Sequence, residues 1–245
     1  MYGTAKKLAL KIFGKDLLFK NEQFLRNIYA ILYSGDKHEC SICNKKLSRF
    51  IILPHNNDRL CPKCGSLARD RRLWNIENSG FIREDITMLD FSPSRSLSCK
   101  LKAVKGITYI STDLSGNFNA EFHYDITNIS LPSESIDLIA CYHILEHIDD
   151  DAKAMNELYR ILKKGGNALI QTPFKEGDIY EDPTITDPRE REIHFGQDDH
   201  VRVYSIEGLK SRLENAGFTV TVTTYEEDIY YGLTNNETVF LLHKN

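Results

Sequence analysis

The second half of the chain alternates short apolar runs with stretches in which apolar residues recur every three or four positions. Apolar runs rich in β-branched residues are typical of strands, and the longer recurrence is typical of helices packed on a sheet. One run, "SIDLIACYH" at 135–143, is nearly continuous, as in a strand that is buried on both faces. The predicted strands lie at 86–89, 107–114, 122–127, 135–143, 167–174, 218–225 and 237–244.

Two helices are predicted between these strands. The first covers 149–166: aspartates open it, and its end carries Lys163, Lys164 and the pair Gly165–Gly166. Its expected buried stripe consists of Ala152, Met155, Tyr159 and Leu162. The second covers 205–217, with Ser205 as N-cap and Gly217 as terminator. Alternating strands and helices predict an α/β fold, a doubly wound sheet that ends in a hairpin.

A further helix is predicted at 21–35, ending at Gly35. Its apolar stripe consists of Phe24, Leu25, Ile28, Ile31 and Leu32. Such a stripe is expected to pack on the neighbouring domain, and attachment to a membrane surface is the alternative because lysines surround it.

Charge divides the chain into two parts. Residues 1–72 hold 15 Lys+Arg against 6 Asp+Glu, whereas the whole chain has a net charge of −4. A basic front and an acidic remainder favour two modules, and two solvated surfaces without separate roles are the alternative. The start lacks the pattern of a signal peptide, and no apolar run approaches the ~20 residues needed to span a bilayer. The sequence therefore predicts a soluble, cytoplasmic protein.

Four of the six cysteines account for the front module. They form Cys40-x2-Cys43 and Cys61-x2-Cys64, with 17 residues between the pairs that could form a short hairpin. Two such turns can direct four thiolates at one structural Zn²⁺ ion, and four thiolates leave no position open for water. Two disulfides are the alternative, which a reducing compartment disfavours.

Acidic residues at the predicted strand ends indicate a ligand. Asp113 follows the second strand, where a carboxylate can accept both ribose hydroxyls of an adenosine cofactor. Asp125 follows the third strand, where it can accept the adenine amino group. Each could instead form a turn, but both together, in this order, favour an adenosine site.

The segment "DITNISLPSESIDLIACYHILEHIDDDAKAMNELYRILKKGGNALIQTPF" resembles the central part of class I S-adenosylmethionine-dependent methyltransferases. The motifs "CPKCGSLARDRRLW" (61–74) and "FGQDDHVRVY" (195–204) resemble those of a little-characterised bacterial group that joins a four-cysteine zinc knuckle to such a domain. The likeness covers roughly residues 38–225. It implies a Rossmann-like class I methyltransferase sheet with a small N-terminal zinc-binding module.

The resemblance also implies where S-adenosyl-L-methionine would bind. The loop "FSPS" (91–94) looks like a variant of that group's "FAPE" loop, although glycine-rich loops are common at this place. The cofactor has no pyrophosphate, so a turn set by Pro93 with serine hydroxyls and exposed amides can meet its carboxylate. Ser94 and Asp90 depart from the group's pattern, which predicts altered affinity or hydrogen bonding. The expected cofactor-binding residues are Asp90, Phe91, Ser92, Pro93, Asp113, Leu114, Asp125, Ile126 and Tyr142.

Catalytic and substrate residues are expected at the carboxyl edge of the sheet. His143 and His147 lie one helical turn apart and are the candidates for a general base, with hydrogen bonding inside the junction as the alternative. The stretch 175–204 has no convincing element and is interpreted as a lid or substrate loop in which His200 and Arg202 contact the substrate. Its His and Asp residues could hold a metal ion, but their spacing does not favour one.

Three classes of function follow. The first is methyl transfer to a small-molecule or glycan-type acceptor. The second is RNA methylation, in which the basic module docks on phosphates; its candidate contacts are Lys45, Lys46, Arg49, Lys63, Arg69, Arg71 and Arg72. The third is a non-enzymatic interaction protein with a degenerate cofactor loop. Arg69 and Arg72 are expected to point from one helical face toward the catalytic domain and its acidic lid, which would assign them to docking between the modules rather than to nucleic acid. The predicted organisation is a helical segment (1–35), a zinc module (36–75) and a methyltransferase domain (76–245).

Overall fold

The computed structural model describes residues 15–54 and 56–245, so the expected N-terminal segment lies partly outside the described residues. The chain divides into two compact units. Unit 1 comprises Met1–Ser79 and Glu226–Glu237, and unit 2 comprises Gly80–Tyr225 and Thr238–Asn245. The segment 226–237 therefore belongs to unit 1, although it follows the methyltransferase-like region in the sequence.

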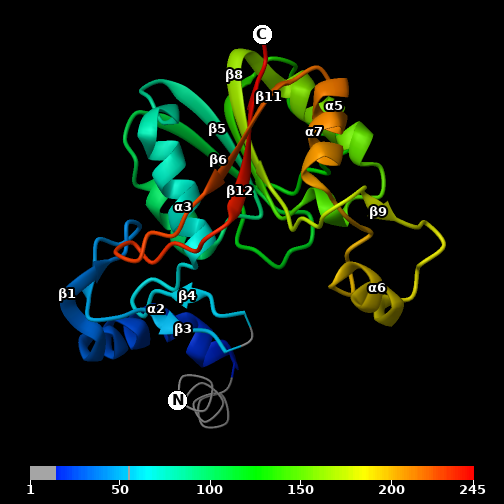
Figure 1. Cartoon of the computed structure of the whole chain (residues 1–245). Coiled ribbons are helices and arrows are strands. Elements are labelled where there is room, and N and C mark those ends of the chain that lie inside the picture. Colours follow the sequence, from blue (N-terminus) through cyan, green and yellow to red (C-terminus); the bar gives the residue numbers. More distant parts are fainter. Residues whose placement is uncertain (1–14, 55) are drawn as a thin grey trace. The chain divides into compact units, whose positions relative to one another are not determined.

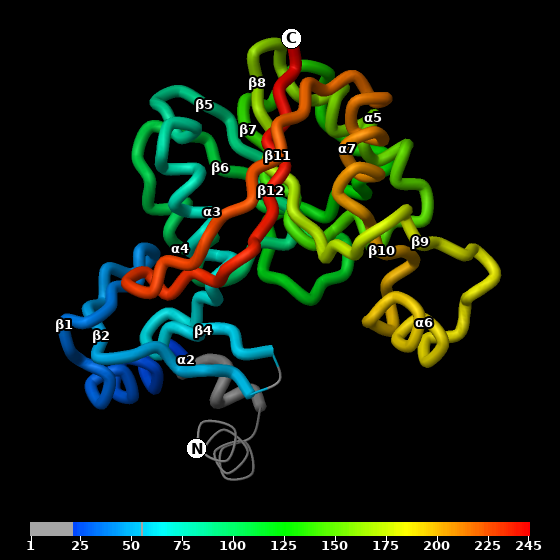
Figure 2. Tube along the Cα trace, in the orientation of Figure 1, coloured from blue at the N-terminus to red at the C-terminus, as the bar shows by residue number. Residues whose placement is uncertain are grey.

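Unit 2 is built on a six-stranded sheet in the order β11-β12-β8-β7-β5-β6, drawn in Figure 1. The four strands from β8 to β6 are parallel, and β12 is antiparallel to β8. Figure 2 shows β11 and β12 running side by side. This arrangement confirms the predicted doubly wound sheet with a final strand pair. In sheet order the strands are β11 (Thr219–Tyr225), β12 (Glu237–His243), β8 (Leu162–Gln171), β7 (Ile136–Tyr142), β5 (Ile86–Phe91) and β6 (Ile107–Thr112).

The chain reverses its direction of winding at β5, which pairs with β6 on one side and β7 on the other. In open α/β sheets ligands bind at such a switch point, just beyond the carboxyl ends of the strands. Phe91 pairs with Thr112 of β6 and with Cys141 of β7, so the three strands end at one level. The segments that follow these strands therefore meet at one edge.

Side-chain caps begin three of the helices of unit 2. These are α4 (Arg95–Lys102), α5 (Asp151–Ile161) and α7 (Ile206–Asn215), which start after Ser94, Asp150 and Ser205. Each capping side chain accepts a hydrogen bond from a backbone N–H of the first turn, as N-cap residues do. Ser205 thus caps α7 as predicted, and Gly217 follows the helix with φ 105°. Helices α5 and α7 lie together in Figure 1 and contribute to one buried core with the sheet.

The first predicted helix, 149–166, extends too far at its C-terminal end. Helix α5 ends at Ile161, and strand β8 begins at Leu162, so the lysines and glycines at 163–166 lie in a strand. Gly165 has φ 76°, and the pairing of β7 with β8 shifts register between Ile136 and Leu138. An irregular strand start resembles a helix end in sequence, because both favour Gly and Lys. The buried face consists of Ala154, Met155, Leu158 and Ile161, whereas Ala152 is exposed.

Two other expectations were also wrong. Residues 122–127 form isolated bridges at Phe122 and Asp125 instead of a third strand. The stretch 175–204, expected to have no elements, holds the short strands β9 (Tyr180–Glu181) and β10 (Arg202–Val203) and the helix α6 (Pro188–Phe195). Asp187 caps α6, Pro188 follows at its first position, and Gly196 ends it in the left-handed conformation. The helix has little apolar periodicity, which is why its sequence did not reveal it.

Unit 1 contains helices α2 (Lys15–Tyr29) and α3 (Ala68–Ile76) and four short strands. Strands β1 (Ser34–Glu39) and β2 (Lys46–Leu47) pair with each other. Strands β3 (Ile51–Ile52) and β4 (Arg59–Leu60) pair as the hairpin predicted between the cysteine pairs. A 3-10 turn, η1 (Ala30–Tyr33), follows α2.

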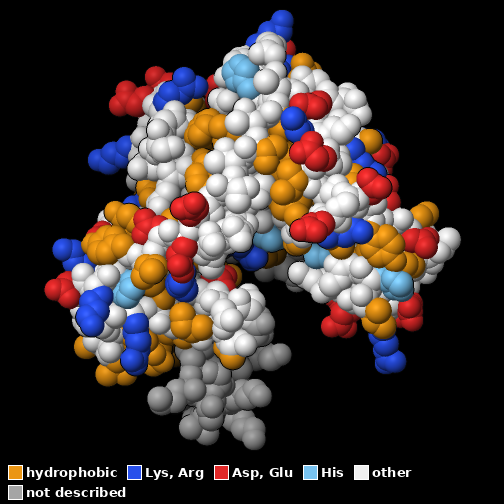
Figure 3. Space-filling model, in the orientation of Figure 1, with side chains coloured by type: hydrophobic (Ala, Val, Ile, Leu, Met, Phe, Trp, Pro, Cys, Tyr) orange, Lys and Arg blue, Asp and Glu red, His pale blue; other side chains and the backbone are white. Residues whose placement is uncertain are grey.

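The apolar stripe of the N-terminal helix is not packed on a domain as expected. Its members lie on α2 and η1, and Phe24 and Leu32 are 64% and 76% exposed. Figure 3 shows hydrophobic side chains on the surface in the region where Figure 1 draws α2. Among the helices that the structure describes, none is both long and apolar enough to span a bilayer.

Candidate functional site

Four cysteine side chains converge in unit 1. Cys40 Sγ lies 3.6 Å from Cys64 Sγ, and Cys43 Sγ lies 3.7 Å from Cys61 Sγ. All four are free thiols, whereas a disulfide would bring two sulfurs to about 2 Å. With Zn–S bonds of about 2.3 Å, tetrahedral geometry separates the sulfurs by about 3.8 Å. The cluster therefore fits a structural zinc site.

Two tight turns of the same design present these thiols. The Asn44 N–H donates to Cys40 O at 2.7 Å, and the Gly65 N–H donates to Cys61 O at 3.0 Å. Asn44 has φ 54° and Gly65 has φ 81°, so each turn has a left-handed residue four positions after its first cysteine. Asn and Gly adopt this conformation most readily. Local sequence therefore sets the position of each thiol pair.

Arg71 on α3 ties this module together. Its guanidinium is fully buried and donates to Ser66 O, Arg59 O, Tyr231 O and Gly232 O at 2.7–2.8 Å. It also lies over the Phe50 ring, at 4.4 Å from the centroid. All contacts lie within unit 1, including the segment 226–237 that returns to it from the end of the chain. Arg71 is thus a structural residue of the module.

Arg72 is engaged in the same way. It pairs with Glu237 at 3.3 Å and donates to Glu226 O and Thr234 O. The expectation that Arg72 points toward the lid was wrong, because these partners belong to 226–237. Arg71 and Arg72 are buried, so neither is available to phosphate groups as the RNA interpretation required, while Arg69 is exposed.

The glycine-free loop after β5 makes a tight turn. Ser92 adopts φ 46°, and its N–H donates to Thr112 O at 2.7 Å. Phe91 and Pro93 are buried, and Asp90, 2% exposed, accepts a hydrogen bond from the Tyr109 hydroxyl at 2.9 Å. Ser92 thus adopts the left-handed conformation that a sharp turn requires and that glycine more often adopts. The first amides of α4 follow this turn and form a helix N-terminus, which favours a carboxylate.

Asp113 lies directly after β6 and next to this loop. Its carboxylate accepts hydrogen bonds from Ser92 Oγ at 2.7 Å, Ser115 Oγ at 3.0 Å and the Phe118 N–H at 3.3 Å. Burial raises the pKa of Asp113, but these hydrogen bonds more than offset it, so the pKa is lower than usual. The group is an anion at neutral pH. It fits the ribose hydroxyls of an adenosine cofactor, which would replace the two serine hydroxyls as donors.

The remaining predicted cofactor residues are placed unequally. Asp125 is exposed and accepts from the N–H and the hydroxyl of Thr127, both at 2.8 Å, which is a local turn. Ile126 is 4% exposed and belongs to the core. Leu114 is 63% exposed after β6, and Tyr142 ends β7. The structure thus joins Ser92 and Asp113 by a hydrogen bond, whereas Asp90 bonds with Tyr109 and Asp125 bonds within its own loop.

The histidine candidates flank a buried carboxylate. His143 follows β7 with φ 56°, and its Nδ1 lies 3.2 Å from Glu146 Oε1. Glu146 is 1% exposed on η3 (Leu145–His147). Burial raises the pKa of Glu146, but His143 and the Thr172 hydroxyl hold it below its usual range. Non-glycine residues with positive φ cluster at functional sites, and a carboxylate that orients an imidazole is typical of a general base.

The two predicted substrate residues belong to the segment that covers η3. His200 is 2% exposed, and its Nδ1 lies 3.1 Å from Phe195 O. Arg202 pairs with Glu181 at 2.8 Å and donates to Asp149 O at 2.9 Å and to Ile148 O. The guanidinium is therefore engaged by the protein itself, and it connects 175–204 to the start of α5.

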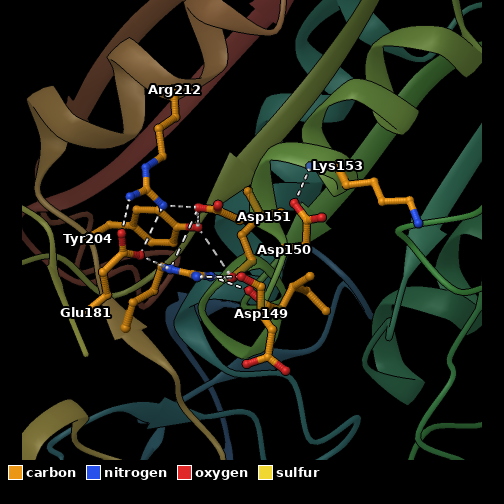
Figure 4. Close-up of polar contacts among 10 residues, drawn as sticks. Asp149, Asp150, Asp151, Lys153, Glu181, Tyr204 and Arg212 are labelled. Atoms are coloured by element: carbon orange, nitrogen blue, oxygen red, sulfur yellow. Dashed lines mark hydrogen bonds and ion pairs between the residues drawn. The ribbon is translucent and has the colours of Figure 1, made fainter. Parts of the chain in front are cut away.

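This connection forms part of a partly buried ion network (Figure 4). Arg212 on α7 bonds Asp151 at 2.5 Å and Glu181 at 2.5 Å, and the Tyr204 hydroxyl donates to Asp151 at 2.5 Å. Burial raises the pKa of Tyr204 well above its usual value, so the phenol stays protonated and donates. Hydrogen bonds from Arg212 and Arg202 lower the pKa of Glu181. A cavity of about 720 Å³ adjoins this network, and its lining includes Asp149, Glu181, Arg191, Val201, Arg202 and Arg212.

Sequence reasoning missed Glu146, Asp151, Glu181 and Arg212. Glu146 lay inside the quoted motif "ILEHI" but was passed over in favour of the histidines on either side. Asp151 was interpreted only as a helix-opening acid. Glu181 and Arg212 have no spacing signal, because their partners lie 21 to 61 positions away.

Comparison with protein-family models matches residues 67–223 to a methyltransferase domain. A curated Mycolicibacterium smegmatis protein, named as a probable S-adenosylmethionine-dependent methyltransferase, is 29% identical over 101 residues. That stretch covers 41% of this chain and 35% of the relative, so the chain spans about a third of the relative's length.

Solved structures share the fold. Haemonchus contortus phosphoethanolamine N-methyltransferase 2 in complex with S-adenosyl-L-methionine matches with a TM-score of 0.51 and 16% identity, over 71% of this chain and 52% of that chain. The [4+2]-cyclase SpnF matches with a TM-score of 0.53 and 14% identity, over 76% and 70% of the two chains. At such identities the likeness concerns the fold, and the two names show that this fold carries different activities.

Proposed function

Because the chain belongs to the methyltransferase domain family, we propose that it transfers a methyl group from S-adenosyl-L-methionine to a small-molecule or glycan-type acceptor. The observation that carries the cofactor part is the charged Asp113 beside the tight turn at Ser92, at the switch point of the sheet. The acceptor class rests on the burial of Arg71 and Arg72, which leaves fewer cations for RNA.

The roles of the individual residues follow from their places. When bound, S-adenosyl-L-methionine supplies a sulfonium methyl that is already activated, so the protein mainly aligns the acceptor and excludes water. Asp113 accepts the ribose hydroxyls, and the N-terminus of α4 meets the amino-acid carboxylate. His143, oriented by Glu146, accepts the proton of an acceptor hydroxyl.

The organisation of the chain is part of this proposal. The four-cysteine module folds around Zn²⁺ as a structural appendage, and residues 76–225 with the last strand carry the chemistry. Residues 175–204 cover the acceptor, and Arg202 positions this segment through η3 and the start of α5. His200 belongs to the same cover.

The test is cofactor binding by the purified full chain, measured by calorimetry. Asp113→Ala should weaken S-adenosyl-L-methionine binding at least tenfold, about 1.4 kcal/mol, since the ribose hydroxyls lose a charged acceptor. Ser115→Ala is the matched control, because it keeps the carboxylate and removes only a competing donor. An unmodified protein that binds neither the cofactor nor its demethylated product would contradict the proposal and favour the interaction protein.

Methyl transfer is then measured with labelled cofactor and fractionated cell extract. His143→Ala should lower turnover while cofactor binding is unchanged. Label that appears in RNA instead of small molecules or glycans would overturn the acceptor class and leave the cofactor assignment intact.

A further inference from the structure

A second cluster of metal-ligating side chains lies in unit 2. Glu146, His147 and His200 each offer one ligand atom, and these atoms all lie within 4.8 Å of one another. The rings of His147 and His200 meet edge to face, with centroids 4.6 Å apart. Two of the residues come from η3 and the third comes from 54 positions further along. Spacing within 175–204 therefore could not reveal the cluster.

Two buried atoms of this cluster lack a protein partner. Glu146 Oε2 and His200 Nε2 make no hydrogen bond of normal geometry with residues 15–54 or 56–245, although their side chains are 1% and 2% exposed. Leaving a buried polar atom unpaired costs about 1–3 kcal/mol, so such atoms in a folded protein need an explanation. Both atoms belong to the same cluster, which points to one ligand shared between them.

The other ring nitrogens are held as metal-binding histidines require. His200 Nδ1 donates to Phe195 O at 3.1 Å, because a carbonyl can only accept, and this leaves Nε2 with its lone pair. His147 Nδ1 lies 3.3 Å from Asp199 Oδ2. Metal-ligating histidines usually donate their second N–H to a carbonyl or carboxylate, which fixes the tautomer and the ring orientation.

Backbone contacts preorganise the cluster. The Val201 N–H donates to Glu146 O at 2.9 Å, and Arg202 donates to Leu145 O and Ile148 O on either side of it. The two residues that follow His200 therefore hold it against η3 without a bound ligand. A cluster that the backbone already holds in place favours ligand binding, because few side chains lose conformational freedom when the ligand binds.

We propose that Glu146, His147 and His200 bind one divalent transition-metal ion, separate from the four-cysteine cluster. Two imidazoles and one carboxylate suit Zn²⁺ or Fe²⁺ and leave coordination positions open. His147 is 29% exposed, which gives the site access to solvent. Together with the proposed function, on which this part rests, an oxygen of the acceptor occupies an open position beside His143.

The test uses the full chain with zinc in the four-cysteine cluster and Co²⁺ as the probe. Cobalt in the second site should show visible d–d bands without the near-ultraviolet bands of sulfur ligation, at one equivalent per chain. Glu146→Gln and His147→Gln should each lower its affinity at least tenfold. His194→Gln, an exposed histidine of the same segment, is the matched control and should bind as the unmodified protein does.

A protein that takes up no cobalt with nitrogen and oxygen ligands, or variants with unchanged affinity, would overturn the proposal; the two buried atoms would then bind water. Should Glu146→Gln fail to fold by circular dichroism, His147→Gln decides, because its side chain is partly exposed. Cofactor binding is measured on the same samples. Cobalt binding without cofactor binding contradicts only the proposed function, and the reverse result contradicts only the metal site.

Discussion

The surroundings of Arg71 in unit 1 and the sheet edge around Glu146 in unit 2 use buried polar groups in opposite ways. The Arg71 side chain is fully buried, and each of its nitrogens donates to a nearby oxygen. At the sheet edge, three buried atoms find no such partner among the described residues: Glu146 Oε2, Gln171 Oε1 and His200 Nε2.

In our proposal, this difference separates a region that stabilises the fold from one that binds a ligand. A satisfied buried network rigidifies a fold, whereas unpaired buried groups cost free energy and persist where a ligand or chemistry uses them. The basic residues of unit 1 were expected to meet a partner, yet Arg71 and Arg72 serve the module itself. The lid was expected to contact the substrate. Its Arg202 instead bonds with Glu181 and with Asp149 O, whereas His200 Nε2 has no hydrogen-bond partner among the described residues.

The largest effect should come from breaking the cysteine cluster. Cys61→Ser removes a thiolate, and structural zinc contributes about 10–16 kcal/mol in small zinc-folded peptides. We expect loss of one Zn²⁺ per chain by metal analysis and protease sensitivity confined to unit 1. Cys99→Ser, at an exposed free thiol, is the control. Retention of both zinc and protease resistance would show that unit 1 does not depend on the metal.

A smaller effect should follow Arg71→Lys, which keeps the charge but cannot reproduce the guanidinium fork. Several carbonyls lose a charged donor at about 1.5–3 kcal/mol each, so unit 1 should lose at least about 3 kcal/mol of unfolding free energy. Denaturant unfolding measures this loss. Arg69→Lys on the same helix is exposed and should change little. Equal losses of unfolding free energy in the two variants would show that the buried contacts of Arg71 do not stabilise unit 1 more than the exposed Arg69 does.

The smallest effect should come from Thr172→Val at the sheet edge. The Thr172 hydroxyl is buried and helps to lower the pKa of Glu146, but it makes no hydrogen bond of normal geometry among the described residues, so its replacement by a methyl group should change the unfolding free energy by no more than about 1 kcal/mol. Ser66→Ala is the matched control in unit 1, where the hydroxyl accepts from Arg71, and it should be destabilising. Destabilisation by Thr172→Val beyond about 1 kcal/mol would mean that the edge is as satisfied as unit 1.

Local pattern predicted the elements whose signal is contained in a few neighbouring residues. The apolar run 135–143 predicted β7, and Ser205 and Gly217 predicted the two ends of α7. The spacing of the two cysteine pairs predicted the two tight turns that hold the thiols. Pattern failed at 163–166, where Lys and Gly suit both a helix end and an irregular strand, and at 188–195, where a capped helix has little apolar periodicity.

The sequence by itself determined the sheet, the four-cysteine cluster and the strand-end acid Asp113, because each depends on periodicity or on spacing along a short stretch. Tertiary structure alone decided that Arg71 and Arg72 bond with 226–237, that Arg202 is clamped to η3, and that His200 meets Glu146 and His147. The physical reason is that these contacts join residues 53 to 165 positions apart. No local propensity encodes such pairings, and only the folded chain brings these residues together.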